Sequence, residues 1–119
     1  MNRLLDIKRL LHSLIYSVDG LKSAVTSQVS FVLELAIGAL LIPIAIWLGQ
    51  SGLEIALMIS VLMLVLIVEL INSAIETTVD RIGMDNNVLS KNAKDMGSAA
   101  VFLALINVPL VWCLVIFAY

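Results

Sequence analysis

Four polar side chains recur at helical spacing in one strongly apolar part of the sequence: Glu69, Asn72, Glu76 and Asp80. Because each residue of an α-helix adds about 100° of rotation, all four lie within about 80° of one another on one face. The preceding residues, 55–68, contain a single polar side chain. An ionised carboxylate inside a bilayer costs on the order of 2.5 kcal/mol or more, so we expect these acids to have a function.

Depth along this helix narrows the chemistry of the acidic face. Glu69 lies about 21 Å of helix rise beyond Ile55, within hydrocarbon, and Glu76 lies about 10.5 Å nearer to water. A desolvated carboxylate can act as a base toward a lipid hydroxyl, and a carboxylate at the surface can bind Mg²⁺ together with nucleotide phosphates. Lys91 and Lys94 would neutralise phosphate charge during transfer. The pattern therefore suits phosphoryl transfer from a soluble nucleotide to an amphiphile.

The usual phosphate-binding loops are absent from the sequence. It contains no GxxxxGK[ST] motif, and no kinase-type glycine loop precedes a lysine. The residues by themselves therefore indicate only a metal or phosphate site at a membrane interface. The simplest alternative is that the acidic face only forms hydrogen bonds between helices. A single Asn or Ser would favour this alternative more strongly than this set of acids does.

Composition assigns the chain to a membrane. Of 119 residues, 61% are hydrophobic and 13% are charged, and the mean hydropathy is +1.09. A hydrocarbon core of about 30 Å needs about 20 helical residues. We predict an all-α membrane protein with one domain over residues 1–119, whose transmembrane helices, with their cytoplasmic extensions, cover 29–48, 53–82 and 91–119. The last helix enters the hydrocarbon near Ala99.

An amphipathic surface helix is predicted before the first span, over residues 1–26. Its apolar side chains recur every three or four residues: Leu4, Ile7, Leu11, Leu14, Ile15 and Val18. This helix carries cations and precedes a span, which is typical of a helix in the membrane interface. We expect Gly20 and residues 26–28 to bend the chain into the bilayer, and Ser90 to cap the start of the last helix.

Basic residues predict the orientation in the membrane. All seven lie before the first span or between the second and third: Arg3, Lys8, Arg9, Lys22, Arg81, Lys91 and Lys94. The positive-inside rule then assigns the N-terminus and the loop near Met84 to the cytoplasm, and Gln50 and Tyr119 to the other side. Trp47 and Trp112 lie near span ends on that side, as interfacial anchors do.

Self-association is the simplest way to shield the buried polar residues from lipid. Three helices do not easily bury Glu34, Glu69, Asn72 and Glu76 among themselves. Small residues on the last helix would allow helices to approach closely, and these are Ala93, Gly97, Ala100 and Ala104. We therefore expect a homo-oligomeric bundle.

Three segments resemble the bacterial membrane-integral diacylglycerol kinase family: Glu69-Leu-Ile-Asn-Ser-Ala-Ile-Glu76, Val79-Asp-Arg-Ile-Gly83 and Ala93-Lys-Asp-Met-Gly-Ser-Ala-Ala100. The resemblance covers nearly the whole chain. It implies a homotrimer of three-span protomers in the bacterial inner membrane, with composite active sites between subunits. It also implies that MgATP phosphorylates diacylglycerol to phosphatidic acid, with no nucleic acid as a partner.

The resemblance also implies roles for individual residues. Glu69 is expected to be the general base, Asn72 to support it, and Glu76 to bind Mg²⁺. The nucleotide site is expected to contain Arg9, Tyr16, Gln28, Glu76, Asp80, Asp85, Asn86, Asn87, Lys94 and Asp95. The lipid substrate is expected to contact Arg9, Glu34, Trp47, Glu69 and Ser98.

One position departs from the family pattern. Gln28 stands where the family usually has a metal-binding glutamate, and Val32 replaces a usual arginine. An amide oxygen can ligate Mg²⁺ but brings no charge, so Glu76 would supply the charge and metal affinity would fall.

Three other functions remain open at this point. Undecaprenol kinase would use the same machinery on a polyprenol. A proton- or ion-conducting bundle would need polar residues throughout the second span, and residues 55–68 offer almost none. A structural assembly partner would neither hydrolyse nor transfer phosphate from MgATP.

Overall fold

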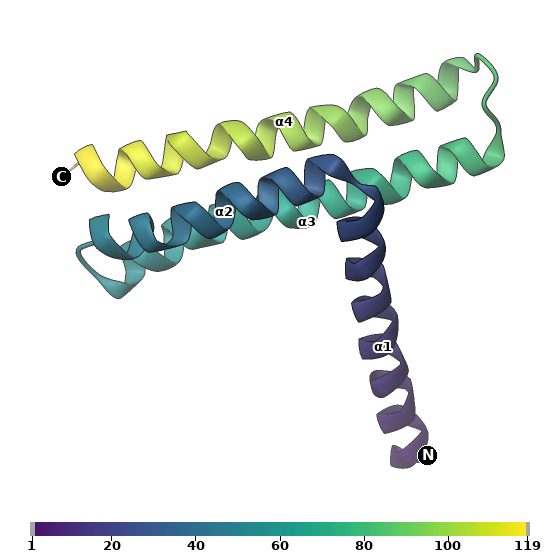
Figure 1. Ribbon diagram of the computed structural model, residues 1–119, viewed down its shortest axis with the longest axis horizontal. Coiled ribbons are helices and arrows are strands. Elements are labelled where there is room, and N and C mark those ends of the chain that lie inside the picture. Colours follow the sequence, from purple (N-terminus) through teal and green to yellow (C-terminus); the bar gives the residue numbers. More distant parts are fainter. Residues whose placement is uncertain (1, 119) are drawn as a thin grey trace.

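The computed structural model describes residues 2–118, and over these it is built from helices alone (Figure 1). In chain order they are α1 (Arg3–Ser27), α2 (Val29–Leu48), α3 (Gly52–Ile82) and α4 (Val88–Phe117). The predicted all-α class is therefore confirmed. Tyr119, expected on the outer side of the membrane, lies outside the described residues.

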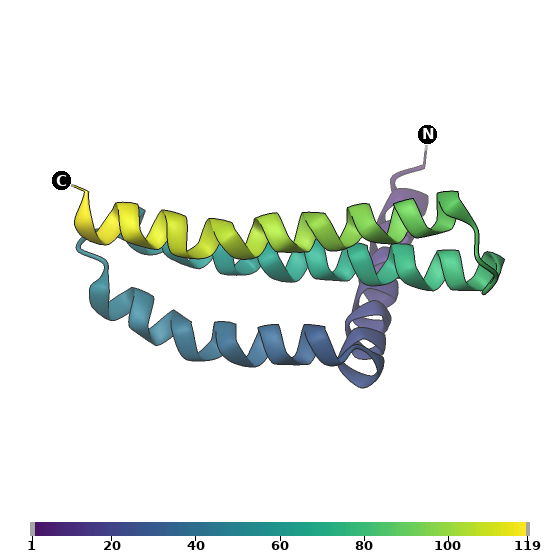
Figure 2. The same ribbon diagram turned by 90° about the horizontal axis from the view of Figure 1, so that it is seen from above.

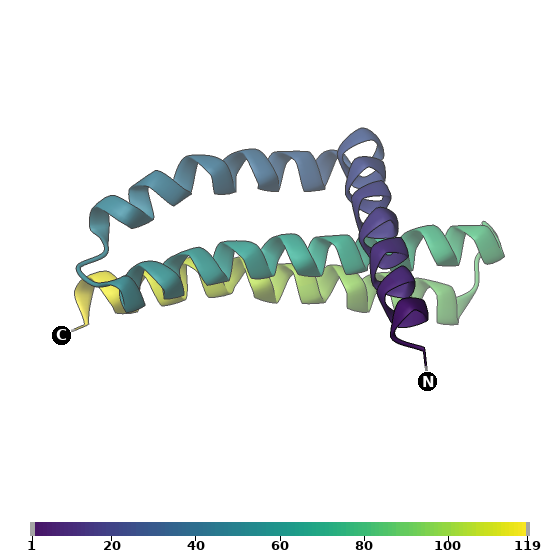
Figure 3. The ribbon, with the colours of Figure 1, turned by 90° about the horizontal axis from the view of Figure 1, so that it is seen from below.

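The break between α1 and α2 is confined to Gln28. This residue is extended, with φ −115° and ψ 101°, and it serves as both the C-cap of α1 and the N-cap of α2. The bend expected at Gly20 is wrong, because α1 continues through this residue to Ser27. The chain turns a corner at Gln28, and from this corner α1 points away from the other helices at a steep angle (Figures 1 and 3).

The α3 and α4 helices form a long antiparallel hairpin joined by residues 83–87. The cap of α4 is Asn87, whose Oδ1 accepts hydrogen bonds from the backbone N–H groups of Leu89 (2.9 Å) and Ser90 (3.2 Å). The prediction that Ser90 caps this helix is therefore wrong. An asparagine three residues earlier is an equally good N-cap and satisfies two free N–H groups at once.

The α3 helix is the centre of the fold, since it contacts both α2 and α4 (Figure 2). Half of the buried apolar side chains belong to it. They are Met58, Val61, Leu62 and Val65 on α3, with Ala24 on α1, Phe31 and Ala45 on α2 and Ala104 on α4. Small residues on α4, Gly97 and Ala104, lie at its contact with α3 and are buried within a single chain.

Three helices are long and apolar enough to cross a membrane. They are α2, α3 and α4, with mean hydropathies of 2.4, 2.6 and 2.6 over their most apolar windows. Most of their apolar side chains face outward, Leu40, Leu103 and Leu114 among them. A surface of this kind needs lipid or further protein to cover it, so the chain is a membrane protein.

A hydrogen bond joins α4 to α3 near the end of the hairpin opposite its loop. Nε1 of Trp112 donates to the backbone oxygen of Met58 at 3.1 Å. We expect Trp112→Phe to lower the free energy of unfolding by about 0.6 kcal/mol, the average for a polar contact between membrane helices. Titration with sodium dodecyl sulfate in mixed micelles measures this. Trp47→Phe is the control, because Trp47 is 81% exposed; an equal loss in both variants would contradict the assignment.

Candidate functional site

The acidic face of α3 passes from buried to exposed along the helix. Glu69 and Asn72 are 5% and 8% exposed, Glu76 is half-buried and Asp80 is exposed. Nδ2 of Asn72 donates to Oε1 of Glu76 at 3.4 Å, one helical turn away. The polar residues predicted to share a face therefore do so, and their environment changes in step with their position.

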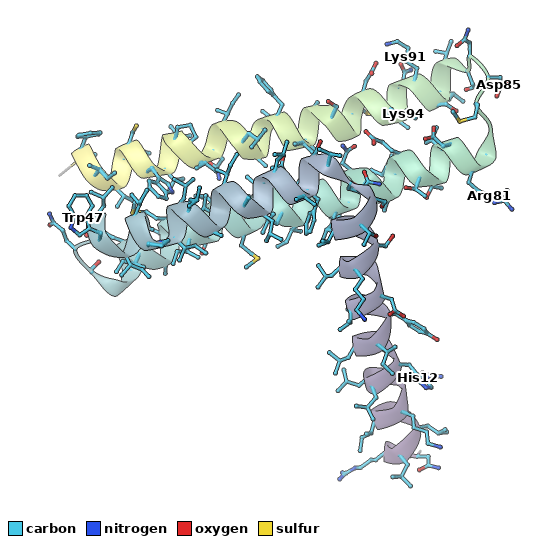
Figure 4. The ribbon with its side chains drawn as sticks, viewed as in Figure 1. His12, Trp47, Arg81, Asp85, Lys91 and Lys94 are labelled. Atoms are coloured by element: carbon cyan, nitrogen blue, oxygen red, sulfur yellow. The ribbon has the colours of Figure 1, made fainter. Side chains whose placement is uncertain are left out.

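A cavity of about 390 Å³, lined mostly by polar and charged residues, lies at the loop end of the α3–α4 hairpin. Six residues expected at the nucleotide site line it, namely Asp80, Asp85, Asn86, Asn87, Lys94 and Asp95. Lys91, which is expected to neutralise phosphate charge together with Lys94, also lines it, and so does Ser90, for which no role at the site is expected. Figure 4 shows Lys91, Lys94 and Asp85 gathered at this end, with Arg81 nearby on α3.

Both lysines of this cavity are in ion pairs. Nζ of Lys94 lies 2.6 Å from Oδ1 of Asp80, which joins α4 to α3, and Nζ of Lys91 lies 2.6 Å from Oδ2 of Asp95 within α4. All four side chains are substantially exposed, and exposed pairs of this kind contribute little to stability. An anionic ligand could therefore draw either ammonium group away from its aspartate at small cost.

A second cavity, of about 770 Å³, lies at the corner between α1 and α3. Gln28 lines it together with Ser73, Thr77 and Leu70 of α3. Since the apolar α2 helix begins directly after Gln28, these α3 residues are level with the start of a membrane span. Glu69 is adjacent in sequence to Leu70 and therefore lies just inside that level.

The expected metal ligands Gln28 and Glu76 are not brought to a common cavity within one chain. Gln28 lines the corner cavity, and Glu76 is not among its lining residues. Over residues 2–118, no group of three or more His, Cys, Asp or Glu side chains is placed to hold a metal ion. A cation at Glu76 would thus take most of its ligands from elsewhere.

Glu34 occupies a third, mostly apolar cavity of about 170 Å³ between α2, α3 and α4. Its neighbours there include Gly38, Val65 and Leu105. Its Oε2 atom is buried and has no hydrogen-bond partner among the described residues. A carboxyl group in this position is available to a ligand that carries a hydroxyl group.

Glu69, Asn72 and Glu76 line none of these three cavities, and four more expected site residues lie apart from them. Arg9 and Tyr16 are exposed on α1, with Tyr16 at 70%, and Figure 4 shows the same helix carrying His12 away from the hairpin. Trp47 lies at the opposite end of the molecule from Lys94 (Figure 4). Ser98 is exposed on α4. A single chain therefore holds part of the expected site, and α1 does not complete the hairpin cavity of its own chain.

Comparison with known proteins decides the family. The profile of the prokaryotic diacylglycerol kinases matches residues 15–116. The chain belongs to the prokaryotic diacylglycerol kinase family. The matched range contains both the acidic face and the hairpin cavity, so the resemblance seen in residues 69–83 and 93–100 is confirmed.

Individual members of the prokaryotic diacylglycerol kinase family are similar over nearly their full length. The diacylglycerol kinase of Haemophilus influenzae is 46% identical over 112 residues, which cover 94% of this chain and 95% of that protein. The Pseudomonas aeruginosa enzyme is 46% identical over 110 residues (92% and 89%). The Escherichia coli K12 enzyme is 41% identical over 118 residues (99% and 97%). Membership of this family makes the chain a lipid kinase.

Proposed function

We propose that this protein transfers the γ-phosphoryl group of ATP to the hydroxyl of diacylglycerol, giving phosphatidic acid and ADP. The observation that carries the proposal is the continuity of the acidic face with the hairpin cavity. Glu69 is buried in the apolar part of α3, and Asp80, three turns further along, borders the cavity that contains two lysines. One helix thus connects the depth of a lipid hydroxyl with the water that brings a nucleotide.

Glu69 is the proposed base. Its carboxylate accepts the proton of the lipid hydroxyl while the oxygen forms a bond to the γ-phosphorus and the bond to ADP breaks. Because Glu69 is 5% exposed, few water molecules compete for this position. Asn72 donates to Glu76 and so keeps the next carboxylate in place. Glu34, Trp47 and Ser98 are the proposed lipid contacts.

The nucleotide is proposed to bind at the hairpin cavity. Lys94 and Lys91 provide positive charge for the phosphates, and the amides of Asn86 and Asn87 provide hydrogen-bond donors. Asp80, Asp85 and Asp95 surround these groups. Arg9 and Tyr16 would be supplied to this cavity by α1 of a neighbouring subunit, since α1 extends away from the hairpin in its own chain (Figure 1).

Mg²⁺ is the proposed cofactor, bound together with ATP. This ion takes one or two protein carboxylates and completes its octahedral shell with phosphate oxygens and water. The half-buried carboxylate of Glu76 fits the protein's share of that shell, and Gln28 would add a neutral oxygen only after the two residues approach. When bound, the ion neutralises phosphate charge that develops during transfer.

The proposed assembly is a homotrimer in the inner membrane, with the N-terminus and the hairpin loop in the cytoplasm. The positive-inside rule supports this orientation, because all seven basic residues lie on that side of the spans. The apolar outer surfaces of α2 and α4 are available for contacts between copies. In this orientation α1 lies along the cytoplasmic surface with its apolar residues toward the lipid.

Restoring a carboxylate at position 28 tests the metal assignment. We expect Gln28→Glu to lower the Mg²⁺ concentration needed for half-maximal activity by about tenfold, because a second charged ligand strengthens binding of a hard cation. Activity is measured over a Mg²⁺ titration at fixed nucleotide concentration. Gln50→Glu, which adds the same charge in the α2–α3 connection, is the control. An unchanged Mg²⁺ requirement in Gln28→Glu would remove residue 28 from the metal site.

Product analysis tests the proposed substrate. The protein in mixed micelles is given γ-labelled ATP and either dioleoylglycerol or undecaprenol, and the lipid products are separated by thin-layer chromatography. We expect labelled phosphatidic acid to form at a rate well above that of undecaprenyl phosphate. Faster labelling of undecaprenol would replace the proposed acceptor, and no labelling of either lipid would overturn the proposed kinase reaction.

A further inference from the structure

We propose that Gly97 of α4 is a positioning residue that fixes the carboxamide of Asn72 and, through it, the carboxylate of Glu76. The inference rests on the function proposed above, in which Glu76 binds the metal. It concerns a residue without a reactive group, whose effect comes only from the space that it leaves.

Gly97 is buried against the side chain of Asn72. A Cβ atom at position 97 would overlap Oδ1 of Asn72, and it would lie 3.2 Å from Cγ of Asn72 and 3.8 Å from Cδ1 of Ile75. A methyl group therefore cannot be added unless the carboxamide moves. Gly52, the exposed first residue of α3, differs, because a Cβ built there meets no atom of residues 2–118 within 4 Å.

The orientation of the Asn72 amide follows from its two neighbours. A carboxylate only accepts hydrogen bonds, so the Nδ2 group must face Glu76. The Oδ1 atom then points the other way, toward α4, where it is buried and has no conventional donor among the described residues. Only a glycine leaves room for it there, and the Cα–H groups of a glycine can serve as weak donors.

The hydrogen bond between Asn72 and Glu76 depends on this arrangement and is easily broken by a small movement of the carboxamide. The distance from Nδ2 of Asn72 to Oε1 of Glu76 is 3.4 Å, beyond the usual range for such bonds. A displacement of the amide by a fraction of an ångström would release Glu76, and its carboxylate would then sample other rotamers. Gly97 thus affects Glu76, the proposed metal ligand, indirectly through the position of Asn72.

A second explanation is that Gly97 only sets the spacing of the hairpin. It lies three residues after Lys94, which pairs with Asp80 across the same α3–α4 contact. A general widening of the hairpin would affect this ion pair as well as Asn72. A double-mutant cycle between positions 97 and 72 separates the two explanations.

The cycle compares Gly97→Ala, Asn72→Ala and the double variant with the wild type. We expect Gly97→Ala to lower kcat on the order of tenfold, with the KM for diacylglycerol unchanged and the Mg²⁺ requirement raised. In the Asn72→Ala background the same change should have almost no further effect, because no carboxamide remains to be displaced. Gly52→Ala, at the other end of the hairpin from Gly97, is the control and should stay within about twofold of the wild type. Independent, multiplying effects of the two substitutions would overturn the proposal.

A spectroscopic measurement keeps this proposal distinct from the proposed kinase reaction. The ¹⁵N side-chain amide signal of Asn72 reports its surroundings whether or not phosphate is transferred. We expect this signal to shift in Gly97→Ala and to remain in place in Gly52→Ala. An unmoved signal would refute the role of Gly97, whereas a wild-type protein that transfers no phosphate would refute the proposed function alone.

Discussion

Glu69→Gln is expected to lower kcat for phosphatidic acid formation by about 10²- to 10⁴-fold, the usual contribution of a general base. The amide has nearly the same size and shape as the carboxyl group, so the 5% exposed position tolerates it. It cannot accept the proton of the lipid hydroxyl at neutral pH. The measurement is labelled phosphate transfer to dioleoylglycerol in mixed micelles.

Two further measurements make this result specific to the base. Nucleotide affinity and oligomeric state should match those of the wild type, because the hairpin cavity does not include Glu69. Glu54→Gln, in the first turn of α3, removes a charge at the other end of the same helix and should leave kcat unchanged. If Glu69→Gln retained wild-type kcat, the proposed mechanism would be wrong.

The second large effect is expected from mixing two inactive variants. Arg9→Ala damages the part of the site on α1, and Lys94→Ala damages the part on the hairpin. If α1 completes the site of a neighbouring subunit, co-assembled variants should recover up to about one quarter of the wild-type rate, because random mixing unites two intact parts at about one site in four. The variants are unfolded together, reassembled and assayed.

A matched mixture shows whether this recovery comes from shared sites. Lys94→Ala and Asp80→Asn both damage the hairpin, since these two side chains form one ion pair. Their mixture should remain inactive, because every hairpin in it carries a defect. If Arg9→Ala and Lys94→Ala also failed to recover activity, each chain would have to hold a complete site by itself.

The acidic face was predictable because it depends only on helical geometry. Each of Glu69, Asn72 and Glu76 lies about one turn from the next, and any α-helix places them on one side. Their burial followed from the apolar residues before them. The three spans were likewise evident from composition, because about 20 apolar residues leave few alternatives to a membrane helix.

Contacts between helices could not be derived from the sequence. The pairing of Asp80 with Lys94, and of Asn72 with Gly97, depends on the register of the hairpin, which is set by a short loop. The sequence marks Gly97 as a small residue that allows helices to approach closely, but nothing in the sequence identifies its neighbour. The direction of α1 depends on one extended residue, Gln28, within a run of polar residues.

The unequal lengths of α2 and α3 have a consequence for how the protein responds to its host bilayer. The 20 residues of α2 extend about 30 Å, just enough for the hydrocarbon, whereas the 31 residues of α3 extend about 46 Å. Hydrophobic mismatch therefore affects α2 before α3. In a thicker bilayer α2 would be shorter than the hydrocarbon core, and Gln28 at its start would be drawn toward the hydrocarbon. The same movement would shift the acid on α3 relative to the glycerol backbone of the surrounding lipids, so membrane thickness becomes a tuning variable for catalysis.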